Sequence, residues 1–138
     1  MNFDKKILEG SATLSVEKVD PKATHVILDA RGLNINSFVD DSNGAKLDFK
    51  LYPEDYVGSK LEVALPNSNE KIVKIKANYE TSPNCTALQW LPPAQTAGKT
   101  HPYVFSQCQA IHCRSMVPCQ DTPAVKMPYS AEVILYLI

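Results

Sequence analysis

The first eighty residues alternate between apolar and polar positions with a period of two, the pattern of half-buried β-strands. Within each run the apolar side chains fall on one face of an extended segment. In chain order the runs are Ala12, Leu14 and Val16; Leu33, Ile35 and Val39, with Ser37 interrupting; Leu47, Phe49 and Leu51; Leu61, Val63 and Leu65; and Val73, Ile75, Ala77 and Tyr79. A shorter run, His25–Leu28, has the β-branched character of a central strand.

Turn-forming residues separate these runs and predict where the chain reverses. Asp20-Pro21, Pro53–Asp55 and Pro66–Asn69 combine proline with Asp or Asn, a composition that favours turns. Asn43-Gly44 is the strongest hairpin signal, because both residues tolerate positive φ. No segment of ten residues shows the periodicity of an amphipathic helix. The sequence therefore predicts an all-β chain, with residues 1–138 forming a single β domain around an antiparallel saddle-like or sandwich sheet.

From Thr81 onward the alternation stops and the composition changes. Thr81–Tyr129 holds all four cysteines, the only tryptophan and two of the three histidines. The elements expected here are short strands at Ala87–Leu91 and Pro102–Phe105, a turn region at Pro92–Thr100, one or two helical turns within Gln107–Arg114, and a strand at Val125–Val133 with an edge or bulge at Pro128. We therefore expect a long irregular loop segment on a rigid sheet, where binding residues tend to gather.

Charge and the N-terminal residues exclude several classes of function. Lys and Arg number 14 against 15 Asp and Glu, and charges of both signs alternate without blocks. We therefore expect no nucleic-acid partner and no membrane partner. The first residues contain no apolar run of signal-peptide length, which favours a cytoplasmic, reducing location with four free thiols.

The cysteines and histidines allow two chemical readings. Cys108, His112, Cys113 and Cys119 carry zinc-binding groups, but their spacing is not that of a common zinc finger or ribbon. We therefore expect no metal site and read these cysteines as small buried hydrophobes. A nucleophilic pair, with Cys108 or Cys113 attacking and His101 or His112 as base, lacks an orienting third group. No histidine is followed by Glu, so an HExxH motif is absent, and we assign no catalytic residue.

Gln107 and Gln109 are the candidates for binding. An amide side chain offers both a donor and an acceptor, and in an extended segment these two side chains would share one face. The residues alone leave two readings open: contact with a peptide's amino terminus or backbone carbonyl, or satisfaction of backbone groups inside a cramped loop. Taken alone, they favour the second.

A family resemblance favours the first reading. The chain resembles the N-terminal domain of zinc aminopeptidases of the gluzincin type, in the branch that contains leukotriene-A4 hydrolase and aminopeptidase B. The matching segments are Phe105–Ala110, Cys113-Arg114, the Pro-Cys-x-Asp-x-Pro-x-x-Lys run that starts at Pro118, Ala87–Leu91 and Gln95–Lys99. The match is specific over Tyr79–Val133 and looser, but in register, from about Phe3.

The resemblance implies that Gln107, Gln109 and Ala110 line the substrate pocket of a complete enzyme. Other members carry Glu at the position of Gln109, where it binds the α-amino group of the substrate. The residues to which we give structural roles in this loop are Arg114, Pro118, Cys119, Asp121 and Lys126. A charge-assisted bridge between Arg114 and Asp121 would stiffen it, because the guanidinium fork matches a carboxylate.

The chain also departs from the family. The zinc-binding catalytic domain is absent, so zinc and the peptide substrate belong to the full enzyme, and we expect the chain alone to be inactive. A strand that family members carry before Asn2-Phe3-Asp4 is missing, and Ile134–Ile138 does not match. We expect exposed sheet edges and a homodimer that contacts through Ile134–Ile138, the alternative being a monomer whose tail folds onto its own sheet.

The resemblance thus implies the N-terminal fragment of a cytosolic zinc aminopeptidase. A non-catalytic interaction module or regulatory short isoform is the alternative, and a free-standing cysteine-dependent enzyme is a third.

Overall fold

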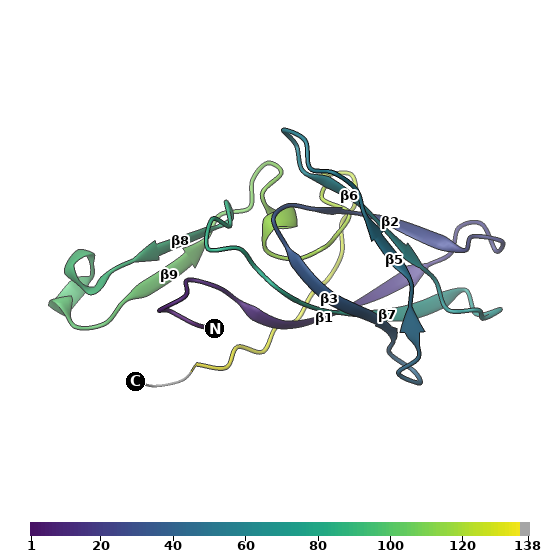
Figure 1. The fold of residues 1–138 in the computed structure, drawn as a ribbon, viewed down its shortest axis with the longest axis horizontal. Coiled ribbons are helices and arrows are strands. Elements are labelled where there is room, and N and C mark those ends of the chain that lie inside the picture. The colour runs from purple at the N-terminus through teal and green to yellow at the C-terminus, as the bar shows by residue number, and fades with distance from the viewer. Residues whose placement is uncertain (136–138) are drawn as a thin grey trace.

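The computed structural model describes residues 1–135 and is an all-β molecule with antiparallel sheets, as the alternation predicts (Figure 1). One sheet has the strand order β1 (Glu9–Glu17), β7 (Ile72–Glu80), β3 (Asn34–Asp40) and β4 (Lys46–Leu47). A second has the order β2 (His25–Ala30), β6 (Ser59–Ala64) and β5 (Phe49–Leu51). The hairpin of β8 (Leu88–Leu91) and β9 (Tyr103–Ser106) forms a third. No helix within residues 1–135 has the length and apolar character needed to cross a membrane.

The two larger sheets face each other across one apolar core, which makes this part of the molecule a β-sandwich. Leu61 and Val63 of β6 are completely buried, and so are Ile75 and Ala77 of β7. The other buried residues of this core are Leu28, Ala30, Leu33, Phe38, Leu65 and Val73. The alternation of β6 and β7 is therefore confirmed, because every second side chain lies between the sheets.

Strand β3 does not keep the register that its sequence pattern predicts. Between Ile35 and Ser37 its pairing with β7 shifts by one residue, which leaves Asn36 without a partner. Such a bulge exchanges the two faces of the strand for all residues that follow. Phe38 therefore enters the core with 1% of its surface exposed, while Val39 is only half-buried. The expectation that Val39 shares the inner face with Leu33 and Ile35 is wrong.

Two further strand expectations are wrong in an informative way. The run Leu47–Leu51 is not one strand: Leu47 pairs with Phe38 of the first sheet and Phe49 pairs with Val63 of the second. The chain crosses between the sheets at this point and closes one side of the sandwich. Strand β2 lies at the edge of its sheet instead of the centre, and its Ile27, on the face opposite the buried Leu28, is 45% exposed.

The hairpin β8–β9 projects away from the sandwich and ends in two short 3₁₀ helices, η1 (Pro93–Gln95) and η2 (Ala97–Lys99) (Figure 1). Its strands lie where the sequence predicts them. The N-terminal segment runs beneath it, and the Phe3 ring packs edge-on against Trp90 at 5.2 Å between centroids. This contact fixes the start of the chain to strand β8 of the hairpin.

The segment after Asp121 has no strand, so the prediction of one at Val125–Val133 is wrong. This segment runs alongside the N-terminal segment in Figure 1, and the amino group of Met1 donates to the carbonyl oxygen of Ile134 at 3.1 Å. Ile134 and Leu135 remain more than half exposed. Residues 136–138 lie outside the described part, so the predicted contact through Ile134–Ile138 stays a prediction.

Replacing Phe38 tests the bulge directly. Phe38→Ala should lower the free energy of unfolding by about 3–5 kcal/mol, because it removes a fully buried aromatic ring. Val39→Ala is the matched control and should cost only about 1 kcal/mol, since its side chain is half-buried. Urea denaturation of both variants measures the difference, and an equal loss in the two would contradict the inner position of Phe38.

Candidate functional site

The candidate site is the loop 107–121, which connects the hairpin to the sandwich (Figure 1). The Gln107 amide donates to the carbonyl oxygen of Ala87 at 2.9 Å and so continues the pairing of β8 with β9. The chain then turns, and the His112 amide donates to the Cys108 carbonyl oxygen at 3.0 Å. A single turn of 3₁₀ helix, η3 (Cys113–Ser115), follows. This agrees with the prediction of at most one or two helical turns within Gln107–Arg114.

The three predicted pocket residues lie together at the exposed tip of this turn. The side-chain oxygen of Gln107 accepts a hydrogen bond from the Gln109 backbone amide at 3.0 Å. The peptide bond between Gln109 and Ala110 is cis. Gln109 and Ala110 are exposed, and the Gln109 side chain makes no hydrogen bond within residues 1–135. Gln107 thus braces the loop with its carbonyl group, while the whole amide of Gln109 faces solvent.

Ser115 ties the loop to the hairpin from inside. Its side chain is 1% exposed, and its hydroxyl donates to the His112 carbonyl oxygen at 2.7 Å. The same oxygen accepts from the Ala87 amide at 3.0 Å and from the Thr86 hydroxyl at 3.2 Å. The Cys85 thiol donates to the Ser115 carbonyl oxygen at 3.0 Å. One buried hydroxyl therefore joins the start of β8 to the middle of the loop.

Arg114 anchors the opposite side of the loop. Its Nε donates to Asp121 Oδ2 at 3.0 Å, its Nη2 donates to the Asp121 carbonyl oxygen at 3.0 Å, and its own amide donates to Oδ2 at 3.1 Å. Its Nη1 donates to the Val57 carbonyl oxygen at 3.0 Å and lies 3.7 Å from Asp29 Oδ1. The ion pair expected between Arg114 and Asp121 is therefore present. It is buried on both sides, with about a tenth of each side chain exposed.

The end of the loop pairs with the edge strand β2. The Asp29 amide donates to the Cys119 carbonyl oxygen at 2.8 Å, and the Cys119 amide donates back to the Asp29 carbonyl oxygen at 3.3 Å. The Asp121 amide donates to Asp29 Oδ2 at 2.9 Å. This pairing covers backbone groups of an edge that would otherwise be open. Pro118 is fully buried beside it.

Two residues close to this anchor depend on its geometry. Gly58 has a φ of +128°, and a Cβ there would lie 2.7 Å from the Ala30 carbonyl oxygen and 3.2 Å from Arg114 Cδ. Only glycine fits both the angle and the space. The Tyr79 hydroxyl donates to the Met116 carbonyl oxygen at 3.0 Å. Burial raises the pKa of Tyr79 to about 12, so the phenol keeps this proton at neutral pH.

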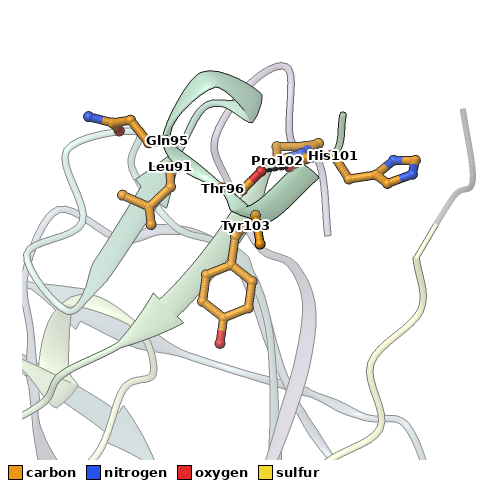
Figure 2. Close-up of a pocket in the computed structure, with 7 residues that line it drawn as sticks. Leu91, Gln95, Thr96, His101, Pro102 and Tyr103 are labelled. Carbon is orange, nitrogen blue, oxygen red and sulfur yellow. Dashed lines mark hydrogen bonds between the residues drawn. The ribbon is translucent and has the colours of Figure 1, made fainter. Parts of the chain in front are cut away.

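The histidines are not paired with cysteines. The ring Nδ1 of His112 lies 2.9 Å from the Thr86 hydroxyl, and His101 lies at the tip of the hairpin. At this tip a shallow depression is lined by Leu91, Gln95, Thr96, Ala97, His101, Pro102 and Tyr103 (Figure 2). The Thr96 hydroxyl donates to the His101 carbonyl oxygen at 2.7 Å there, while the His101 ring points away. The proposed Cys–His nucleophilic pair has no support among residues 1–135.

The cysteines of the loop gather around Cys113, and all four cysteines of the chain are free thiols. The sulfur atoms of Cys113 and Cys119 and a carboxylate oxygen of Asp121 lie within 4.8 Å of one another. The pKa of the Cys113 thiol is lowered to about 7, chiefly by hydrogen bonding from Cys119 and to a lesser extent from Cys108. Desolvation, followed by the charge on Cys113, raises the pKa of Cys108 to about 11. The pKa of Cys119 is raised, first by its hydrogen bond to Cys113 and then by burial.

Comparison with known proteins identifies the family. The family model described as the peptidase M1 N-terminal domain matches residues 1–136. The chain belongs to this family. Leukotriene A-4 hydrolase of Xenopus laevis is 43% identical over 138 residues, which cover 96% of this chain and 22% of that protein. Leucine aminopeptidase 2 of Phaeosphaeria nodorum is 42% identical over 132 residues, covering 94% of this chain and 21% of that protein.

A solved structure agrees with these relatives. The structure of native yeast LTA4 hydrolase superposes with a TM-score of 0.81 at 36% identity, covering 91% of this chain and 20% of that one. The resemblance to the leukotriene-A4 hydrolase branch is therefore confirmed. The peptidase M1 N-terminal domain described here spans about a fifth of the length of the relatives it matches.

Sequence reasoning missed several residues that hold the loop of this M1 N-terminal domain. Ser115 belongs to no sequence motif, and only the fold shows that it lies with Thr86 at the junction of loop and hairpin. Asp29 stands in an alternating strand like any surface carboxylate. Lys126, expected to be structural, is exposed and forms no ion pair within residues 1–135. Its structural role stays a prediction.

Removing the Arg114 side chain should destabilise the whole sandwich. Arg114→Ala leaves the buried Asp121 carboxylate uncompensated, and breaking one partner of a buried ion pair costs about 3–5 kcal/mol. Lys71→Ala is the matched control, because Lys71 forms a shorter ion pair with Glu17, at 2.7 Å, with both side chains largely exposed. We expect the control to change stability little. Chemical denaturation followed by Trp90 fluorescence measures both, and similar losses would show that burial of the Arg114 pair is unimportant.

Proposed function

We propose that this chain supplies one wall of the substrate pocket to a zinc aminopeptidase of the leukotriene-A4 hydrolase type. Membership of the peptidase M1 N-terminal domain family supports it. So do two relatives, one named as an aminopeptidase and one as a leukotriene A-4 hydrolase. The pocket residues are Gln107, Gln109 and Ala110. The free thiols suit a reducing compartment such as the cytoplasm.

The observation that carries the proposal is the state of Gln109. Its backbone is held by Gln107, and the loop around it is fixed to the hairpin through Ser115 and to the sandwich through Arg114. Its side-chain amide is left without a protein partner within the described residues. A polar group held on a rigid support but unsatisfied by the protein suits the binding of a ligand. A side chain needed for packing would be buried or bonded instead.

The chemistry of the amides defines what they would contact. The Gln109 carbonyl oxygen can accept a hydrogen bond from the protonated amino terminus of a peptide. Gln107 uses its oxygen within the loop but keeps two N–H donors, which suit a carbonyl oxygen of the substrate. The loop then recognises the end of a peptide without adding charge. The two glutamines would position the substrate for reaction, because holding it in the correct orientation lowers the barrier.

The hydrolytic step belongs to parts of the enzyme beyond these residues. A zinc aminopeptidase activates water on its metal with a carboxylate base, and no histidine of this sequence is followed by Glu. The residues present therefore do not fit a catalytic zinc site of the HExxH type. We expect the 138 residues alone not to cleave peptides.

Replacing Gln109 in the complete enzyme tests the proposal. Gln109→Ala removes a hydrogen bond to a charged group, worth roughly 1.5–3 kcal/mol, so kcat/KM for aminoacyl substrates should fall about tenfold or more. Gln120→Ala is the matched control, since Gln120 is an exposed glutamine of the same loop, and it should leave kcat/KM unchanged. Equal effects of the two substitutions would make Gln109 a surface residue without a role in binding.

We also propose self-association of the chain as a second candidate function. The supporting observation is a short apolar stretch, Val133, Ile134 and Leu135, in which every side chain is more than half exposed. Uncharged β-branched segments next to an unpaired backbone pair readily with another chain. We expect light scattering to give a dimer mass at micromolar concentration and a monomer mass for Ile134→Lys. A monomer mass for both would rule the idea out.

A further inference from the structure

The thiol cluster of the loop has no part in the pocket proposed above. Cys113, Cys119 and Asp121 converge on one point, with their ligand atoms within 4.8 Å of one another. Cys119 is 7% exposed, and the Asp121 side chain is about a tenth exposed. Two thiols and a carboxylate rarely meet in a protein interior, because each prefers water or a partner when ionised. The convergence of these three side chains therefore suggests that they bind a ligand together.

The spacing is close to that of ligands around one tetrahedral ion. Zinc–sulfur bonds are about 2.3 Å and zinc–oxygen bonds about 2.0–2.2 Å. Two sulfurs on one tetrahedral zinc therefore lie about 3.8 Å apart, and a sulfur and an oxygen lie slightly closer. The observed limit of 4.8 Å exceeds this by about one ångström. Binding of one ion would therefore draw these side chains together by up to about one ångström.

We propose that Cys113, Cys119 and Asp121, with Cys108 as fourth ligand, form a structural binding site for zinc. The donor set of three thiolates and one carboxylate oxygen suits this ion, which takes sulfur and oxygen ligands together. His112 is not a ligand, because its ring contacts Thr86. This set differs from the combination that the sequence suggests, which is Cys108, His112, Cys113 and Cys119. Because His112 and Cys113 are adjacent, their side chains are difficult to direct at one tetrahedral ion.

The backbone around the cluster is already fixed. Cys119 is held by two hydrogen bonds to Asp29, and Cys113 begins the 3₁₀ turn. Within the described residues, the Arg114 hydrogen bonds to the Asp121 carboxylate both go to Oδ2, which leaves Oδ1 for a metal. A ligating carboxylate held by a second residue is the usual arrangement around bound metals. Arg114 would also offset the negative charge that three thiolates bring.

Cys108 completes the donor set from the open side of the cluster. Its thiol lies within hydrogen-bonding reach of Cys113, and it is partly exposed. An ion can therefore reach the cluster from the side of Cys108. Zinc bound there would join both ends of the turn that carries Gln109.

Cobalt(II) titration of the reduced 138-residue chain without oxygen tests the site. Cobalt replaces zinc in such sites and gives a sulfur-to-metal charge-transfer band in the near ultraviolet and visible bands typical of tetrahedral coordination. We expect saturation at one equivalent and loss of these bands when one equivalent of zinc is added. Zinc should also protect Cys108, Cys113 and Cys119 from alkylation by iodoacetamide, as read by mass spectrometry, and leave Cys85 as it was.

Serine variants locate the ligands. Cys113→Ser and Cys119→Ser should each weaken cobalt binding at least tenfold, while Cys85→Ser, which alters a buried free thiol bonded to Ser115, should not. Circular dichroism checks that each variant is folded. If Cys119→Ser does not fold, the half-buried Cys113 decides the matter. The proposal is overturned if the folded, reduced chain gives no charge-transfer band, if Cys113→Ser keeps it, or if Cys85→Ser abolishes it.

Discussion

The guanidinium group of Arg114 is the contact on which the candidate site depends. It is buried, and it joins three parts of the chain that are far apart in sequence: Asp121 at the end of the loop, Val57 before β6, and Asp29 in β2. A buried cation is costly unless it is paired and its donors are satisfied. Here Nε, Nη1 and Nη2 each reach a protein oxygen at 3.0 Å. The loop keeps its shape because any other arrangement would leave the buried Arg114 guanidinium without its partners.

The sequence pattern predicts most of the sandwich, and its failures have physical reasons. Strands β1, β6 and β7 lie where alternation predicts them, since each buries one face against the core. The bulge at Asn36 is invisible in the pattern, because both Phe38 and Val39 are apolar and either could face inward. The division of Leu47–Leu51 between two sheets is equally hidden. Local periodicity says which residues are extended, but pairing partners are set by the whole fold.

The loop shows a similar division. The ion pair of Arg114 and Asp121 could be predicted, because the family resemblance gave both residues structural roles and a guanidinium group matches a carboxylate. Gln107 and Gln109 look equivalent in the sequence. In the structure the Gln107 side chain accepts a hydrogen bond within the loop, while the Gln109 side chain has no hydrogen-bond partner among residues 1–135. The role of Ser115 could not be predicted from the sequence. Its hydroxyl bonds to the Thr86 hydroxyl, the Ala87 amide and the His112 carbonyl oxygen, and only the fold brings these groups together. Local sequence patterns do not predict long-range contacts of this kind.

The loop is attached at one end to the hairpin, through Ser115, and at the other to the edge strand β2, through Cys119. It therefore links the hairpin to the sandwich at two separate points. Any tilt of the hairpin against the sandwich must compress or stretch the turn that carries Gln109. In amide hydrogen exchange the loop amides of Gln107, Cys119 and Asp121, each bonded to one of these bodies, should open together with the sheets and not as an independent surface segment. The loop 107–121 lies on the surface but is then as rigid as the sheets to which it is bonded.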